Sequence, residues 1–447
     1  MNKDNSKVNL FICIYRQTVL RRHIFHFINE ISAQRNINAL EGQKYLKGKD
    51  IIQLRDIRMI SKYALPWHFV KHYLPDDRKK IGRYVRWQAI NKYASHPNAT
   101  VETLQHLIEW SPHVDFVGDY LDKTAINGNL DILKMIHQRY PNTIIHTKKS
   151  VEGAAKNGHL SVIQFLDSID KQVQPLIFTT QVMDNAASGG HKSLVEWLHQ
   201  NRNEGGTERA IKLASENGHF DCVKYLVENM SIKKGTEEAM NMAALNGHYD
   251  IVVYLHQHSY ICTTRAIDGA AAKGHLNIIK FLQENRTEGC SRGAMNISSA
   301  NGHLDCVRFL HNHRSEGCTT DAMDEASANG HLSVVEYLHH NRSEGCTKYA
   351  LDSAAKSNHL SIVKFLVKNR TEGCSSRLNH IIEDLTPEIA SILVPIIPPI
   401  ELSSDDDNFY DDTGDDDDDQ VYNNYMYSNY NYSSSAHFDF DEYYWEP

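Results

Sequence analysis

Histidine is the first residue type that could do chemistry in this chain, because it recurs after a turn-forming residue at a nearly fixed interval. The histidines are His159, His191, His219, His248, His275, His303, His331 and His359. A zinc ion needs three or four ligands about 2 Å away, whereas equivalent residues on neighbouring packed helices lie roughly 8–10 Å apart. Adjacent histidines therefore cannot share an ion. The spacing favours a structural role in turns, and no metal site is expected.

Cysteine forms a second regular series, at Cys290, Cys318, Cys346 and Cys374. A disulfide requires Cα atoms within about 7 Å, and residues roughly 10 Å apart on neighbouring packed helices do not meet that condition. We expect these cysteines to be small buried residues beneath a connector. The sequence shows no clear secretion signal, which favours a reducing compartment. The expected location is cytoplasmic, with the nucleus left open.

Arginine and glutamate recur together in the connectors, as Arg286 and Glu288, Arg314 and Glu316, Arg342 and Glu344, and Arg370 and Glu372. We expect the arginine of one unit to meet the glutamate of the next. Exposed pairs of this kind contribute about 0–1 kcal/mol each. The pattern therefore indicates a solvated polar edge rather than a ligand site.

Motifs of catalysis are missing from the sequence. It contains no phosphate-binding Gly-Lys loop, no G-x-G-x-x-G, no HExxH, no G-x-S-x-G and no set of kinase motifs. Every combination of histidine and acid recurs from unit to unit, whereas an active site is normally singular. The sequence therefore predicts a protein that is not an enzyme, with no cofactor and no small-molecule substrate.

The histidines belong to an internal repeat whose period predicts a solenoid. The residue before each histidine, or its equivalent, is Gly128, Gly158, Gly190, Gly218, Gly247, Gly274, Gly302, Gly330 or Asn358, at intervals of 27 to 32 residues. Structural turns are predicted at Gly158, His159, Gly218, His219, Gly247, His248, Gly274, His275, Gly302, His303, Gly330 and His331. These turns separate two helices in every unit.

One unit shows why. Thr319 or Thr320 can cap a helix over AMDEASA, and Asn329-Gly330 can end that helix in a left-handed conformation. LSVVEYLHH then forms a second helix, whose apolar stripe is wider than a surface helix needs. Each helix pair therefore requires neighbours on both sides.

These residues resemble the ankyrin repeat, whose T-P-L-H-x-A-A-x-x-G-H pattern is matched by DAMDEASANGH and whose V-V-x-x-L follows it. The resemblance is to divergent, short-period ankyrin families of amoebal proteins, and it covers roughly residues 120–380. The Thr-Pro is absent, and the unit is about five residues shorter than the family's period near 33. The family's first histidine is replaced at Asp268, Asn296, Asp324 and Asp352. The resemblance implies an all-α ankyrin-type solenoid with a truncated finger and an unidentified protein partner.

The expected organisation has five parts. Residues 1–83 form a helical N-terminal region, either a cap or a degenerate F-box-like module, with helices over VLRRHIFHFINEI and over MISKYALPWHFVKHYL, the latter broken at Pro66. Residues 84–120 form a degenerate capping repeat, 121–380 the array with a kink or bulged loop at Pro175, and 381–400 a C-terminal cap. Residues 401–447 form a disordered acidic tail rich in Asp, Tyr and Asn.

Charge and apolar runs exclude two further partner classes. The tail has 15 acids and no Lys or Arg, so the remaining 400 residues carry a net charge of +6. That charge is too weak to indicate nucleic-acid binding. The sequence has no apolar run of about 18 residues, so no membrane segment is expected.

Variation among the repeats identifies a candidate partner-binding face. The residue before the invariant alanine changes freely, and the candidates there are Arg209, Glu238, Arg265, Asp321 and Tyr349, with Gly293 in the same column. The third position after that alanine also varies, as Leu213, Met242, Gly269, Ile297, Glu325 and Ser353. The ankyrin resemblance implies that both columns border the concave side, where a partner is bound; drift on a solvated face is the alternative interpretation.

The sequence thus leads to one main hypothesis of function, a non-enzymatic protein–protein interaction scaffold. One alternative is a substrate adaptor that docks to a ubiquitin ligase through residues 1–80. Another is a regulatory tail that folds onto the basic body and competes with acidic partners.

Overall fold

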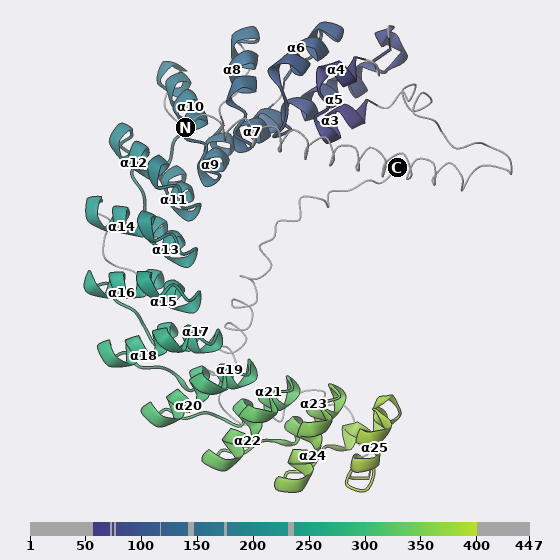
Figure 1. Ribbon diagram of the computed structural model, residues 1–447, viewed down its shortest axis with the longest axis vertical. Coiled ribbons are helices and arrows are strands. Elements are labelled where there is room, and N and C mark those ends of the chain that lie inside the picture. The colour runs from purple at the N-terminus through teal and green to yellow at the C-terminus, as the bar shows by residue number, and fades with distance from the viewer. Residues whose placement is uncertain are drawn as a thin grey trace, which may run out of the picture. The chain divides into compact units, whose positions relative to one another are not determined.

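The computed structural model describes residues 57–71, 74–75, 77–116, 118–141, 147–173, 177–230 and 237–399 (Figure 1). Every regular element within these ranges is an α-helix or a short 3-10 helix, and none is a strand. The predicted all-α solenoid is therefore confirmed. The chain divides into two compact units, residues 1–185 and 186–447. The predictions for VLRRHIFHFINEI, for Pro175 and for the acidic tail fall outside the described residues.

The first unit begins with short helices and continues as helix pairs. Its helices are α3 (Arg58–Tyr63), α4 (Trp67–Val70), η1 (Arg78–Lys80), α5 (Arg83–Ala94), α6 (Val101–Trp110), α7 (Gly118–Ile126), α8 (Leu130–Arg139), α9 (Lys148–Lys156) and α10 (Leu160–Val173). The predicted break at Pro66 is confirmed, because α3 ends before it and α4 begins after it. α5 and α6 lie in the segment of the predicted capping repeat, and Tyr93, Leu104 and Leu121 form part of one buried cluster.

The second unit continues the pairs, after α11 (Thr180–Ser188), which includes the boundary between the units. Its helices are α12 (Lys192–Asn201), α13 (Glu208–Glu216), α14 (Phe220–Asn229), α15 (Glu238–Leu245), α16 (Tyr249–Gln257), α17 (Arg265–Ala272), α18 (Leu276–Asn285), α19 (Arg292–Ala300), α20 (Leu304–His313), α21 (Asp321–Ala328), α22 (Leu332–Asn341), α23 (Lys348–Lys356), α24 (Leu360–Asn369), η2 (Ser376–His380), η3 (Ile382–Asp384) and α25 (Pro387–Leu393).

Two rows of helices build this unit (Figure 1). The odd-numbered helices α13 to α23 pack on one another and form the inner row, and the even-numbered helices α12 to α24 form the outer row. Each inner helix also packs on the outer helix that follows it, and α25 packs on α24. In the outer row Val334, Val335 and Leu338 are buried, as the wide apolar stripe predicted.

Serine or threonine begins several inner helices, for a local reason. The Tyr349 N–H donates to Thr347 Oγ1 at 3.1 Å, and the Gly293 N–H donates to Ser291 Oγ at 3.0 Å. A hydroxyl at this position satisfies one of the backbone donors that the first helical turn leaves free. At the other end Gly330 adopts a φ of 86°, and the chain reverses there because glycine has no Cβ to clash.

The turn side chains bind the preceding repeat as well as their own. His248 Nε2 lies 3.0 Å from Glu216 O, and His359 Nε2 lies 3.1 Å from Ala328 O. The asparagine of the turn acts in the same way, since Asn329 Nδ2 donates to Ala300 O at 2.9 Å. These donors satisfy carbonyls that the end of the preceding inner helix leaves without intrahelical partners.

The glycine in the turn of the preceding repeat makes room for each histidine ring. A Cβ placed on Gly218, whose φ is 77°, would lie 2.5 Å from His248 Cε1. At Gly373, with a φ of 72°, a Cβ would meet nothing within 4 Å. The two glycines share the left-handed conformation and differ in whether a neighbour fills the space.

This difference provides a matched test. We predict that Gly218→Ala lowers the free energy of unfolding by about 2–4 kcal/mol, from left-handed strain together with displacement of the His248 ring. Gly373→Ala should cost only the strain, about 1–2 kcal/mol. Thermal denaturation followed by circular dichroism measures both. Equal losses in the two variants would show that the ring contact contributes nothing.

The Asp or Asn that replaces the first histidine of the ankyrin pattern makes a second bridge between repeats. Asp324 accepts hydrogen bonds from the Thr347 N–H at 2.8 Å and the Thr347 hydroxyl at 2.7 Å. At the equivalent position Asn296 accepts from the Thr319 N–H at 2.9 Å and donates to Thr319 Oγ1 at 2.8 Å. The buried side chain thus positions the residue that begins the next inner helix.

Asparagine at one repeat and aspartate at another predict which exchange the site tolerates. Asp324→Asn should change the melting temperature little, because Asn296 makes the equivalent pair of bonds. Asp324→Ala should cost about 1–3 kcal/mol, because it removes the acceptor of two Thr347 hydrogen bonds, each worth about 0.5–1.5 kcal/mol. Calorimetry of the two variants gives the comparison. An Asn variant as unstable as the Ala variant would contradict this explanation.

The Arg-Glu pairs of the connectors differ from expectation. Arg342 Nε donates to Glu344 Oε2 at 3.1 Å within one connector, so the predicted pairing between units is wrong. Both residues nevertheless reach the preceding repeat: the Cys318 N–H donates to Glu344 Oε1 at 3.5 Å. A Cβ on Gly317 would lie 2.7 Å from Arg342 Nη2. Each pair therefore covers the Gly-Cys of the connector before it.

Aromatic contacts link the outer row. The His311 and Tyr337 rings are perpendicular, with 5.8 Å between centroids and 90° between planes. His339 and Phe365 pack in the same way, with 5.4 Å between centroids and 88° between planes. Such perpendicular contacts add about 0.5–1.5 kcal/mol beyond burial. His311 and His339 are therefore packing residues between successive outer helices.

Candidate functional site

The candidate partner-binding residues all lie at the N-terminal ends of inner helices. Arg209 is the second residue of α13 and is exposed, and Tyr349 is the second residue of α23 with 52% of its surface exposed. Glu238, Arg265 and Asp321 are the first residues of α15, α17 and α21, and they are half-buried. The inner row thus carries these five side chains along one edge.

Two of these residues bind each other. Arg265 Nη1 lies 2.8 Å from Glu238 Oε1, and Lys212 Nζ lies 3.2 Å from Glu238 Oε2. One carboxylate therefore links α13, α15 and α17. Because each of these side chains keeps about a quarter to a third of its surface exposed, solvent screens the pairs, and each contributes about 0–1 kcal/mol. A partner at this edge would meet an ion-paired group rather than free charges.

The second variable column is mostly a packing column, which corrects the expectation that it borders a free surface. Gly269, Ile297 and Ser353 are buried. A Cβ on Gly269 would lie 3.1 Å from Leu245 Cβ, and Leu245, Ala272 and Ile297 form one apolar cluster between inner helices. Residue identity at these positions follows from the close approach of neighbouring helices.

Two acids of α21 belong to the variable columns, Asp321 to the first and Glu325, which is half-buried, to the second. Asp321 and Glu325 are one helical turn apart, and both are half-buried. Burial raises the pKa of Glu325, and the negative charge of Asp321 raises it further. Neither carboxylate takes part in an ion pair with another described residue. A cationic side chain of a partner would relieve the repulsion between them.

Four of the turn histidines have a pKa lowered by their surroundings. Burial lowers the pKa of His219, His275, His303 and His331, and the neighbouring rings of the series lower it further. A hydrogen bond to the backbone of the preceding repeat acts in the opposite direction. No group of three or more potential metal ligands occurs within the described ranges.

The stability of the array should therefore fall in mild acid. Since the folded pKa values lie below the ordinary 6.5, the unfolded chain takes up protons first. Stability from the histidines is complete above that value and is lost as pH falls through the folded values. Asp324 opposes them, because burial raises its pKa from 3.8 to about 6 and its contribution is lost as pH rises through that value.

We predict a lower melting temperature at about pH 5 than at about pH 7.5, because the turn histidines with a lowered pKa outnumber the two acids of α21 with a raised pKa, Asp324 and Glu325. The variant Asp324→Asn should show a steeper fall, since it removes one opposing group. His303→Gln should show a shallower one. A melting temperature that stays constant or rises on acidification would contradict the lowered histidine pKa values.

The cysteines are structural. Cys222, Cys262, Cys290, Cys306, Cys318, Cys346 and Cys374 are all free and buried. Burial raises the pKa of Cys290 to about 12 and that of Cys318 to about 11. The thiolate is the reactive form, so these thiols are poor nucleophiles. The interpretation of the series as small buried residues is confirmed.

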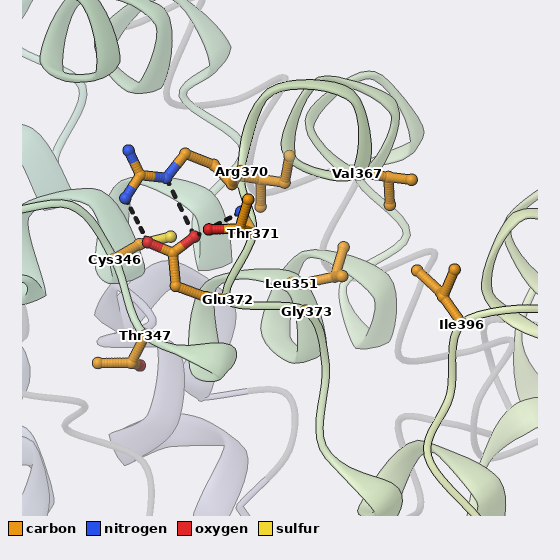
Figure 2. A pocket seen from close by; sticks show the side chains of 10 residues that line it. Cys346, Thr347, Leu351, Val367, Arg370, Thr371, Glu372, Gly373 and Ile396 are labelled. Carbon is orange, nitrogen blue, oxygen red and sulfur yellow. Dashed lines mark hydrogen bonds and ion pairs between the residues drawn. The ribbon is translucent and has the colours of Figure 1, made fainter.

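A pocket of about 150 Å³ lies beside the last repeat (Figure 2). Leu351, Val367 and Ile396 lie on one side of it, and the Arg370–Glu372 pair lies on the other side with the Cys346 thiol. The pocket marks the end of the repetition: Arg370 covers Gly345, whereas nothing covers Gly373. In the sequence the Arg-x-Glu-Gly-Cys pattern occurs for the last time at residues 370–374, and this end of the repetition is the signal that could indicate the pocket.

Together the paired helices, the left-handed glycine turns and the bridges between successive repeats define the class of helical-repeat solenoids. No helix within the described residues is long and apolar enough to cross a membrane.

The family follows from comparison with known proteins. Residues 182–266 and 267–349 match the family model for ankyrin repeats (3 copies). These residues are therefore ankyrin repeats, as the resemblance predicted. No curated protein matches the chain. Ankyrin repeats are generally protein–protein interaction modules rather than enzymes.

Proposed function

We propose that the protein is a non-enzymatic scaffold that binds a protein partner along the N-terminal ends of its inner helices. One observation carries the proposal: these positions vary from repeat to repeat and keep their side chains at the surface, whereas the turn and core positions are nearly constant. Arg209 and Tyr349 are the most accessible of them. A cytoplasmic or nuclear location fits the buried, unpaired thiols.

The candidate residues fall into groups that differ in the contacts they could make with a partner. Glu238 and Arg265 already share an ion pair, so they offer shape and hydrogen-bonding capacity more than net charge. Asp321 and Glu325 offer uncompensated negative charge, and Tyr349 offers an exposed ring. Aromatic and arginine side chains are the residue types that most often dominate a binding energy. Arg209 and Tyr349 are therefore the strongest candidates for such a role.

A matched pair of double variants tests the proposal. Arg209→Glu with Tyr349→Ala alters the inner row, and Lys280→Glu with Tyr249→Ala makes the same chemical changes on exposed outer-row residues. Affinity capture from native cells, with quantitative mass spectrometry, compares both with the unaltered chain. We predict that the inner-row variant loses its partners about tenfold or more, as removal of two interface anchors would. The outer-row variant should retain them, and equal recovery with both would contradict the proposal.

The ubiquitin-ligase adaptor remains an alternative proposal. It depends on residues 1–80, of which the structure describes only the part from residue 57 onward. No contact in that part favours it. The same capture experiment distinguishes it, because an adaptor would recover ligase components that are lost when residues 1–80 are removed, while inner-row partners persist.

A further inference from the structure

A basic surface with an exposed aromatic ring lies around the start of α5, in the first unit and outside the matched ankyrin repeats. We call it the basic–aromatic surface and define it as Arg78, Lys79, Lys80, Arg83 and Tyr84. All five side chains are exposed, and Tyr84 has 68% of its surface accessible. Four cations within six residues are a local concentration that the weak overall charge of the chain does not reveal.

Arg86 holds this surface in one conformation. Its guanidinium donates to Arg78 O at 2.7 Å and to Ile81 O, and Nε donates to Ser111 Oγ at 3.1 Å. These bonds fix η1 against the first turn of α5 and tie both to the end of α6. The guanidinium also lies 6.0 Å from the centre of the Trp110 ring. The exposed cations are therefore displayed from an ordered backbone, which lowers the entropy lost on binding.

The cations have no acidic partner within the described part of the chain. Asp77, the nearest acid in sequence, accepts a hydrogen bond from the Lys79 N–H at 3.0 Å and so begins η1. Asp119 pairs with Lys149 at 3.8 Å. The salt bridges among the described residues include none from Arg78, Lys79, Lys80 or Arg83. The positive charge is available to a ligand.

The aromatic part offers one ring rather than a series. Tyr84 stacks on Trp87 with 5.6 Å between centroids and 25° between planes. Trp87 is half-buried, its Nε1–H donates to Asp115 O at 2.8 Å, and its ring contacts Tyr120 at 5.9 Å and 82°. Trp87 thus supports Tyr84 from beneath, and Tyr84 presents its outer side to solvent.

We propose that the basic–aromatic surface binds an acidic segment of a protein partner, with the cations facing carboxylates and Tyr84 packing against an apolar or aromatic side chain. This would be a second interaction surface, independent of the inner row. Single-stranded nucleic acid is the competing class of ligand, and it requires a groove that follows the backbone with aromatic platforms for successive bases. This surface has one aromatic platform, Tyr84, and one short cluster of cations, on a chain whose net charge is −9. An acidic protein segment therefore fits it better than a nucleic acid strand.

The experiment measures binding of a labelled synthetic peptide of alternating Asp and Glu with a central tyrosine to the full chain, by fluorescence anisotropy. We expect binding that weakens as salt is raised. The double variant Lys79→Glu with Lys80→Glu should weaken it by about tenfold or more, because attraction becomes repulsion. The matched control, Lys134→Glu with Lys148→Glu, makes the same charge change on exposed lysines of α8 and α9. It should weaken binding less than about threefold.

Tyr84→Ala separates the two parts of the surface. It should weaken binding of the tyrosine peptide and leave a peptide with glycine in place of tyrosine unaffected. The proposal is overturned if the Lys79/Lys80 variant and its control bind equally. It is also overturned if a single-stranded oligonucleotide, or a vesicle containing phosphatidylserine, binds more tightly than the peptide through the same lysines.

Discussion

The inner helices from α13 to α21 each end at a carbonyl that accepts a hydrogen bond from the next repeat. A helix that stops in a tight turn leaves carbonyl groups without intrahelical partners, and a buried carbonyl without a partner is costly. Here the following turn provides Asn329 for Ala300, and His248 for Glu216. Glycine at the preceding turn, such as Gly218, leaves the space that the His248 ring occupies. Apolar packing brings the helices together, but these bonds fix the register in which successive repeats meet.

The same arrangement separates structure from recognition. The core, the turns and the connectors are committed to contacts with neighbours, as are most of the residues of the second variable column. The edge proposed for partner binding consists of the N-terminal ends of the inner helices, where packing does not dictate the side chain. Along that edge the chain already combines an ion-paired group on α13, α15 and α17 with two uncompensated acids on α21. A surface of this kind discriminates by the placement of charge more than by apolar area.

Much of this fold could be predicted from the sequence, because period and turn chemistry are local properties. The interval between Gly-His turns, the threonine caps and the wide apolar stripe were sufficient for the helix pairs and their stacking.

Contacts across repeats were harder to predict. Arg342 and Glu344 were assigned to different partners because sequence spacing does not show which way a connector side chain turns. Gly269 and Ile297 varied like surface residues, although close approach of Leu245 and its neighbours determines them. The basic–aromatic surface was missed for another reason: averaging charge over 400 residues concealed a cluster of four cations.

The turn bonds and the Arg-Glu contacts run in one direction along the array. A repeat gives its turn donors and its Arg-Glu pair to the repeat before it, and receives the same groups from the repeat after it. Its two faces are therefore complementary to its own copy, 28 residues away along Cys290, Cys318, Cys346 and Cys374. Tandem duplication of one such segment would create a longer array in which every new junction is already complementary. Gene duplication could in this way lengthen the recognition edge in whole-repeat steps, and each added copy would be free to diverge at the one column that its neighbours do not constrain.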